Sequence, residues 1–170
     1  MKGIRGWFDF ADIYDEMVAK FPSGSRFVEI GVWRGRSTCH MAEAIKNSGK
    51  QIEFFAIDVF NMVSEEVVVK NLVERDLAEF VQIRKGRSQD LALTFDGLCQ
   101  FVFVDGGHRF EDVYEDLRLW WERVVVGGVF AGHDYTDSRY SPEVQWAVDQ
   151  FVRSKKLELI IQGNSWRIQK

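Results

Sequence analysis

Hydrophobic positions along this chain follow two patterns, one typical of amphipathic helices and the other typical of buried strands. Helical spacing begins in residues 7–21, whose apolar members are Trp7, Phe10, Ala11, Tyr14, Met17, Val18 and Phe21. Pro22 and Gly24 end this pattern, so residues 1–22 are predicted to form an N-terminal helix. Further helices are predicted at residues 37–46, 64–78, from Ser88 onward, at 110–124, and from the N-cap Ser141 to Val152.

Short apolar runs between these helices predict strands at residues 27–31, 53–59, 80–84, 100–104 and 128–132. Two more strands, at residues 157–161 and 165–168, flank the turn residues Gly163 and Asn164. Strands that alternate with helices imply a parallel sheet, and the closing hairpin adds an antiparallel strand. The prediction is therefore a Rossmann-like open α/β sheet of about seven strands, mostly parallel with a C-terminal antiparallel hairpin, and with helices on both faces.

Length and composition favour one globular domain over residues 1–170. Hydrophobic residues make up 46% of the 170 positions and aromatic residues 14%, which is enough for a packed core and argues against disorder. The net charge is −4 and no long block of Lys and Arg occurs, so a small molecule is expected as the partner in place of a nucleic acid.

Cysteine usage and the N-terminal charges indicate the compartment. Cys39 and Cys99 belong to no CxxC pair, so both are expected to be buried free thiols. The N-terminal segment lacks an uninterrupted apolar run and carries the acidic residues Asp9, Asp12, Asp15 and Glu16. We therefore expect neither a signal peptide nor a membrane span, and a cytoplasmic protein.

The segment RFVEIGVWRGRST, residues 26–38, predicts a polar-ligand site. A buried strand runs into Gly31 and Gly35, and a helix opened by Ser37 or Thr38 follows. Glycines allow a sharp turn, and the free N–H groups at a helix start attract polar or anionic groups. A dinucleotide turn would have glycine where Trp33 stands, so that ligand is disfavoured. A plain strand-to-helix turn is the alternative.

An acidic residue, Glu29, followed by GxxxG resembles the first motif of class I S-adenosylmethionine-dependent methyltransferases. The resemblance implies that Glu29 faces the ammonium group of the cofactor, directly or through water. It also implies that the loop and helix start contact the cofactor through Gly31, Trp33, Gly35 and Ser37.

Two later segments extend the cofactor site. Asp58 lies 58 − 35 = 23 residues after Gly35, close to the spacing of a carboxylate that binds ribose hydroxyls, although it could be a solvated strand-end residue. GRSQD, residues 86–90, resembles the adenine-side segment of catechol-type O-methyltransferases. That resemblance implies adenine contacts from Ser88 and Gln89, beside Arg87, and an N-cap role for Ser88 is compatible with it.

The fourth and fifth predicted strands end on DGGH and GHDY, which carry the candidate catalytic residues. DGxH and GGVxxGHDY resemble the small methyltransferases that act on macrolide sugars and related antibiotic intermediates. Asp105 also belongs to the implied cofactor contacts. The Lys base of catechol-type relatives is replaced by His108, and an imidazole is a plausible general base at neutral pH. The alternative is a His108 packed under the following helix.

Relatives of this type often hold Mg²⁺, which implies the ligands Asp105, His133 and Asp134. A histidine departs from the oxygen ligands that Mg²⁺ prefers, so the alternatives are Mn²⁺ or Zn²⁺, or no metal. In the last case Asp134 would cap a turn or fix His108.

These features predict an S-adenosylmethionine-dependent O-methyltransferase acting on a hydroxyl of a sugar or small metabolite, by direct in-line transfer. The first helix and residues 134–140 are candidates for an acceptor lid. Because both are short, the acceptor pocket is either open or completed by a second subunit, which makes a homo-oligomer one expected state. A nucleotide- or dinucleotide-binding oxidoreductase and a non-catalytic methyltransferase-like binding module are the alternative functions.

Overall fold

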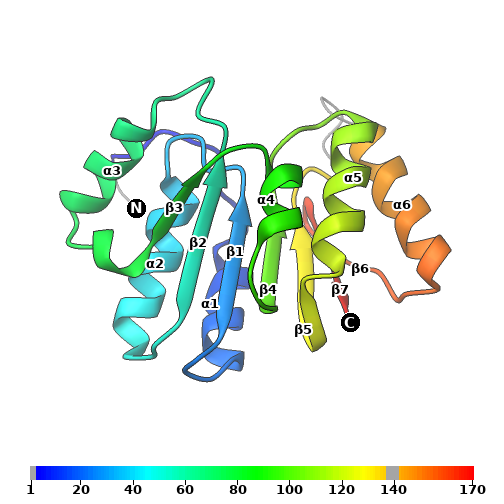
Figure 1. The fold of residues 1–170 in the computed structure, drawn as a ribbon, viewed down its shortest axis with the longest axis horizontal. Helices are drawn as coiled ribbons and strands as arrows, with labels where there is room; N and C mark the ends of the chain where they lie inside the picture. Colours follow the sequence, from blue (N-terminus) through cyan, green and yellow to red (C-terminus); the bar gives the residue numbers. More distant parts are fainter. Residues whose placement is uncertain (1–2, 137–141) are drawn as a thin grey trace. The chain divides into compact units, whose positions relative to one another are not determined.

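The chain forms two compact units in the computed structural model, which describes residues 3–136 and 142–170. The first unit is Met1–Arg87 and the second is Ser88–Lys170 (Figure 1). Together the described residues contain six α-helices, one 3-10 helix and seven strands. No helix within them is long and apolar enough to cross a membrane.

The first unit has three parallel strands in the order β3-β2-β1. Its strands are β1 (Arg26–Ile30), β2 (Glu53–Asp58) and β3 (Gln82–Lys85), and its helices are α1 (Ala11–Lys20), α2 (Arg36–Ser48), α3 (Glu65–Val73) and the 3-10 helix η1 (Ala78–Phe80). The apolar runs of β1 and β2 are almost entirely buried, as expected of strands covered on both faces. The α1 helix packs along α2.

The N-terminal helix starts later than its apolar spacing predicts. It begins at Ala11, and Trp7 lies before it with 65% of its surface exposed. The preceding segment is held in a different way, because Arg36 donates a hydrogen bond to the carbonyl oxygen of Gly6. Ile4 is buried in a cluster that includes Val32 and residues of α2 and α3. Tertiary contacts therefore override the helical pattern of residues 7–10.

The second unit combines parallel and antiparallel pairing in the order β4-β5-β7-β6. Its elements are α4 (Ser88–Thr94), β4 (Cys99–Val104), α5 (Phe110–Trp121), β5 (Val124–Gly132), α6 (Glu143–Lys155), β6 (Ile160–Gln162) and β7 (Ser165–Gln169). The β4 and β5 strands are parallel, whereas β7 is antiparallel to both β5 and β6. The predicted Rossmann-like fold and its closing hairpin are confirmed. The predicted N-cap Ser141 and lid residues 137–140 lie outside the described residues.

Aromatic side chains form much of the core of the second unit. The α5 helix packs on β4 and β5 and contacts both α4 and α6 (Figure 1). The ring of Trp121 on α5 contacts Phe130 of β5 and Phe151 of α6, and Phe130 contacts Trp166 of β7. Gly132 ends β5 where a Cβ atom would come within 2.5 Å of the Trp166 ring. Only glycine fits at this position, directly before the candidate residues His133 and Asp134.

Both cysteines are buried free thiols, as predicted from their spacing. Burial raises the pKa of the Cys39 thiol to about 11, so this sulfur stays protonated and packs as an apolar group.

A buried carboxylate links three elements of the first unit. Glu29 on β1 is 1% exposed, and its oxygens accept hydrogen bonds from the hydroxyls of Tyr14 on α1 and Thr38 on α2. Burial raises the pKa of Glu29 from its ordinary value of 4.5 to about 7, and the hydroxyl donors of Ser37, Thr38 and Tyr14 offset part of that effect.

Glu29 should therefore make the stability of the fold depend on pH. Because its folded pKa is raised, the folded chain holds a proton between pH 4.5 and about 7 that the unfolded chain has lost. The free energy of unfolding should fall as pH rises through this window, by on the order of 3 kcal/mol, and level off above it. Glu29→Gln should remove this contribution, as measured by urea unfolding at a series of pH values.

Glu53→Gln is the matched control, because Glu53 lies at the exposed start of β2, paired with Arg26. It should keep the wild-type dependence on pH. A Glu29→Gln protein with the same pH dependence as the wild type would contradict the buried, proton-binding state of this side chain.

Candidate active site

The loop after β1 has the turn that the glycine spacing predicts. Gly35 has φ +76° and precedes α2, and a Cβ atom there would come within 2.9 Å of the side chain of Val68. Glycine is therefore required both for the left-handed backbone and for close packing against α3. Ser37 follows in the first turn of α2 and is buried.

Most N–H groups of this loop are already bonded within the first unit. The N–H of Gly31 donates to Ile57 O at 2.9 Å, and the N–H of Gly35 donates to Val32 O at 2.8 Å. Val32 and Trp33 donate their N–H groups to the carboxylate of Asp58. The first-turn N–H groups of α2, which no helix satisfies by itself, are therefore the donors best placed for an external ligand.

Asp58 and Glu29 both face groups of the protein. Asp58 accepts backbone N–H bonds from Val32 at 2.8 Å, Trp33 at 3.0 Å and Phe60 at 2.7 Å. Glu29 lies in the buried network with Tyr14 and Thr38. Their contacts with ribose and with an ammonium group stay predictions from the sequence.

The predicted adenine segment spans the boundary between the two units. On its first side, the N–H of Gly86 donates to Asp58 O at 3.0 Å, and Arg87 ends the unit. On its second side, the buried hydroxyl of Ser88 donates to the carboxylate of Asp116 on α5. Gln89 donates to Asp112 O at 3.5 Å. The α4 helix begins at Ser88, as predicted, and adenine contacts of Arg87, Ser88 and Gln89 stay predictions.

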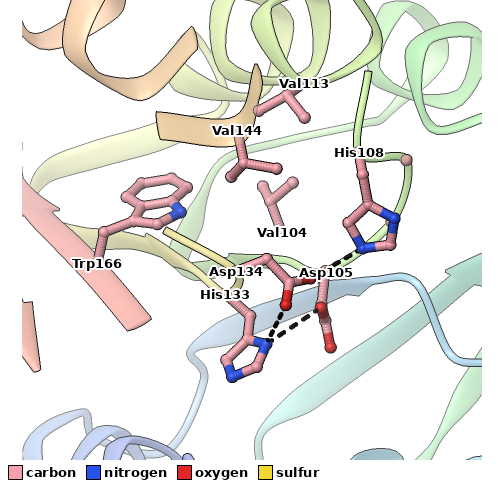
Figure 2. Close-up of a pocket in the computed structure, with 10 residues that line it drawn as sticks. Val104, Asp105, His108, Val113, His133, Asp134, Val144 and Trp166 are labelled. Atoms are coloured by element: carbon pink, nitrogen blue, oxygen red, sulfur yellow. Dashed lines mark hydrogen bonds and ion pairs between the residues drawn. The ribbon is translucent and has the colours of Figure 1, made fainter. Parts of the chain in front are cut away.

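Four polar side chains meet in a pocket of the second unit (Figure 2). Asp105 and His108 follow β4, and His133 and Asp134 follow β5, so adjacent parallel strands bring them to the same edge. The opposite wall of the pocket is apolar and is formed by Val104, Val113, Val144 and Trp166. The sequence prediction that these strand ends share one site is therefore matched by the structure of this unit.

Asp134 lies between two imidazoles. The Nε2 atom of His108 is 2.8 Å from Oδ2 of Asp134, and the Nδ1 atom of His133 is 3.1 Å from Oδ1. Burial alone would raise the pKa of Asp134, but the hydrogen bonds from His108 and His133 outweigh it and hold this pKa well below the usual range. An ionised Asp134 accepts, so Nε2 of His108 carries the proton of this hydrogen bond.

The exposure of these side chains separates their roles. The side chain of His108 is 36% exposed, so it is not packed under α5, whereas those of Asp134 and His133 are 9% and 3% exposed. His108 is therefore accessible to solvent, whereas Asp134 and His133 contact it or its partner from within the protein. This matches the alternative considered from the sequence, in which Asp134 fixes His108.

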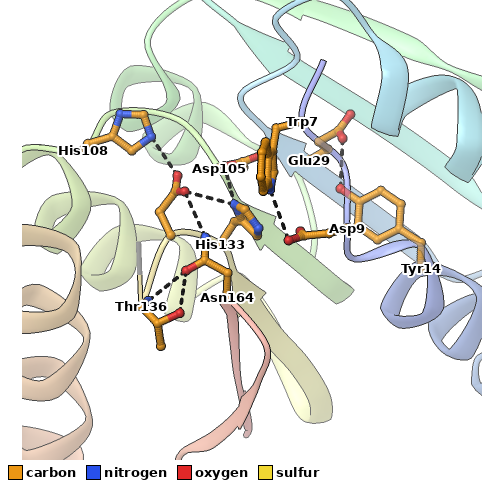
Figure 3. A network of polar contacts seen from close by, with 10 residues as sticks. Trp7, Asp9, Tyr14, Glu29, Asp105, His108, His133, Thr136 and Asn164 are labelled. Carbon is orange, nitrogen blue, oxygen red and sulfur yellow. Dashed lines mark hydrogen bonds and ion pairs between the residues drawn. The ribbon is translucent and has the colours of Figure 1, made fainter. Parts of the chain in front are cut away.

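Asn164 contributes to this site, although the sequence indicated only a hairpin turn there. Its Oδ1 atom accepts a 2.9 Å hydrogen bond from the N–H of Thr136 (Figure 3). Its carbonyl oxygen accepts one from the N–H of Tyr135 at 3.0 Å. Its Nδ2 atom donates to Oδ1 of Asp134 at 3.5 Å. These bonds hold Asp134 at φ +61°, a conformation that costs a non-glycine residue energy.

The same pocket offers ligands for a divalent cation. Asp105, His108 and Asp134 each supply one ligand atom, and these atoms lie within 4.8 Å of one another. His133, predicted as the third ligand, has its Nδ1 atom 3.7 Å from Oδ1 of Asp105 and is buried behind the carboxylates. Two carboxylates and an imidazole fit Mn²⁺ or Zn²⁺ better than Mg²⁺.

Residues 28–135 match the family described as "Methyltransferase domain". An uncharacterized protein of Acanthamoeba polyphaga mimivirus is 33% identical over 135 residues, which make up 74% of this chain and 58% of that protein. The chain thus spans less than two thirds of the length of this relative.

Several solved structures have the same fold. The O-methyltransferase NovP matches with a TM-score of 0.81 and 22% identity over 94% of this chain and 78% of its own. A candidate rRNA methylase from Clostridium thermocellum matches with a TM-score of 0.75 and 18% identity, over 98% and 99% of the two chains. The O-methyltransferase TomG from Streptomyces achromogenes, in complex with S-adenosylmethionine, matches with a TM-score of 0.71 and 16% identity, over 100% and 83%.

These matches agree with the family that the strand-end motifs resemble. Because the family match covers most of β1, the glycine loop after it and the ends of β4 and β5, this chain belongs to the methyltransferase-domain family.

Proposed function

We propose that this methyltransferase transfers the methyl group of S-adenosylmethionine to a hydroxyl oxygen of a sugar or another small metabolite. The observation that supports this most is the pairing of the partly exposed His108 with the ionised Asp134, both of which line the pocket. A hydroxyl is a weak nucleophile until it loses its proton, so an oxygen acceptor needs such a base. NovP and TomG, which share the fold, are O-methyltransferases.

His108 acts as the general base in this proposal. Its Nδ1 atom takes the proton of the acceptor hydroxyl as the oxygen attacks the methyl carbon. The new O–CH₃ bond forms while the S–CH₃ bond breaks, and the sulfonium becomes the neutral thioether of S-adenosylhomocysteine. Asp134 stabilises the imidazolium that results, and Asp105 is placed to orient the acceptor hydroxyl.

The donor contacts are proposed from the sequence motifs. The methionine end would bind at the loop after β1 and the start of α2, the ribose at Asp58, and the adenine near Arg87, Ser88 and Gln89. The contacts proposed for the methionine end come from Glu29, Gly31, Trp33, Gly35 and Ser37, and Asp105 would also contact the donor. The first-turn N–H groups of α2 support this assignment because they suit the carboxylate of the methionine moiety.

A divalent cation is compatible with this site. Asp105 and Asp134 would hold it together with His108 or His133. When bound, it would lower the pKa of an acceptor hydroxyl.

A small acceptor is favoured over RNA by the charge of the chain. The net charge is −4, whereas RNA-binding surfaces gather positive charge. Because a candidate rRNA methylase shares the fold, RNA belongs in any panel of acceptors.

The first prediction is that the protein binds S-adenosylhomocysteine but not NADH. Calorimetric titration should give saturable heat with S-adenosylhomocysteine at one site per chain, and a fluorescence titration with NADH should show no binding. Absence of heat at millimolar S-adenosylhomocysteine would contradict the donor assignment.

The second prediction concerns the base. With methyl-labelled S-adenosylmethionine and a panel of sugars, nucleoside diphosphate sugars, catechols and RNA, label should enter a hydroxyl compound. His108→Gln should lower kcat about 100-fold or more without changing the affinity for S-adenosylhomocysteine. His40→Gln is the control, because His40 pairs with Asp15 at 2.8 Å in the first unit, and it should keep the wild-type rate.

Two results would contradict this mechanism. An unchanged kcat in His108→Gln would exclude the imidazole as the base. Cofactor binding without transfer to any hydroxyl compound would instead favour a methyltransferase-like binding module.

The third prediction concerns the cation. Mn²⁺ followed by electron paramagnetic resonance should bind at one site, and Asp134→Asn should abolish this binding because a carboxylate ligand is lost. His108→Gln and His133→Gln should differ, and the weaker binder of the two identifies the ligating imidazole. If Mn²⁺, Zn²⁺ and Mg²⁺ all fail to bind, the site works through the His108 and Asp134 pair alone.

A further inference from the structure

Besides the ribose contact expected from motif spacing, Asp58 accepts hydrogen bonds from backbone N–H groups of two loops. The loop between β1 and α2 must keep a fixed shape to present the start of α2 to a ligand. Two of its N–H groups, those of Gly31 and Gly35, are bonded to backbone carbonyls. The N–H groups of Val32 and Trp33 point instead to a single oxygen, Oδ2 of Asp58, at 2.8 Å and 3.0 Å.

The other oxygen of Asp58 holds the following loop. Oδ1 accepts the N–H of Phe60 at 2.7 Å, so one carboxylate joins the segment after β1 to the segment after β2. Hydrogen bonds to an ionised acceptor are stronger than those between neutral groups. A carboxylate offers about four lone-pair positions, and three are used here, which leaves little capacity for two ribose hydroxyls.

Two of the residues that donate to Asp58 have a strained, left-handed backbone. Trp33 has φ +48° and Phe60 has φ +56°, a left-handed conformation that is unfavourable for large aromatic residues. Both donate their N–H groups to Asp58. The ring of Trp33 is 44% exposed, so packing of this ring does not explain its turn, whereas Phe60 is buried in an apolar cluster. The shared acceptor offsets the cost of both turns.

We propose that Asp58 is a positioning residue that clips the two loops together and so shapes the donor site, with contact to the ribose as a lesser role. The proposal rests on the proposed binding of S-adenosylmethionine at this edge of the first unit. Without the clip, Trp33 would relax toward a right-handed or extended backbone. The first turn of α2 would then lose its fixed orientation toward the methionine carboxylate.

A thermodynamic cycle distinguishes the clip from a ribose contact. S-adenosylhomocysteine is compared with its 2′,3′-dideoxyribose analogue, which lacks the ribose hydroxyls, in the wild type and in Asp58→Ala. The clip predicts that Asp58→Ala weakens both ligands by the same factor, about 10-fold or more. A ribose contact predicts a loss for S-adenosylhomocysteine alone, with the analogue bound equally by both proteins, and this result would overturn the proposal.

Asp58→Asn provides a second variant of nearly the same size in case the alanine variant does not fold. Its amide nitrogen cannot accept, so at least one backbone bond is lost, and again both ligands should weaken equally. Asp15→Ala is the matched control, because Asp15 pairs with His40 on the surface of the same unit, and it should leave both affinities unchanged.

Amide hydrogen exchange gives a readout that needs no ligand. In Asp58→Asn the amides that lose their acceptor, either that of Phe60 or those of Val32 and Trp33, should exchange at least 10-fold faster than in the wild type, while amides within β1 stay protected. Unchanged exchange at these positions would overturn the clip. If the wild type binds neither ligand, the proposed donor site fails, and the exchange result still decides the role of Asp58.

Discussion

Carboxylates placed at buried strand ends must find hydrogen-bond donors, and this requirement shapes the local structure in both units. An unpaired buried carboxylate would cost several kcal/mol, which is a large part of the free energy of unfolding of a typical domain. Glu29 is satisfied by hydroxyls, Asp58 by backbone N–H groups and Asp134 by two imidazoles. These hydrogen bonds fix three different parts of the molecule. Those of Glu29 join α1 to β1, those of Asp58 hold the loop before α2, and that of Asp134 with His108 orients the imidazole.

The hydrogen bonds that satisfy Asp134 also determine the state of His108, the candidate base. Because its neighbours keep it ionised, it can only accept from His108, so this hydrogen bond fixes the tautomer and the orientation of the imidazole. The cost of its left-handed backbone is offset by hydrogen bonds from the β5 end to Asn164 in the β6–β7 turn. The antiparallel hairpin at the end of the chain therefore also supports the loop that carries the candidate residues His133 and Asp134.

Most of the fold could be predicted from the sequence because apolar runs and helical spacing report burial directly. The strand ends could also be predicted, since parallel strands bring Asp105 and Asp134 to one edge. Contacts that depend on tertiary structure could not. The apolar spacing of Trp7 did not reveal that α1 begins at Ala11, and the turn signal at Asn164 did not reveal its bonds to the β5 loop. Nor could spacing show that backbone N–H groups occupy Asp58.

Asp134 holds His108 with the proton of the neutral imidazole on Nε2, and this state underlies the proposed role of His108 as a base. Nitrogen-15 NMR of the imidazoles tests it most directly, because the chain has only three histidines and each can be assigned by substitution. In metal-free protein at a pH where the imidazole is neutral, the account predicts a protonated Nε2 coupled to Asp134 and an unprotonated Nδ1. A His108 that carries its proton on Nδ1, or one whose spectrum is unchanged in Asp134→Asn, would contradict it.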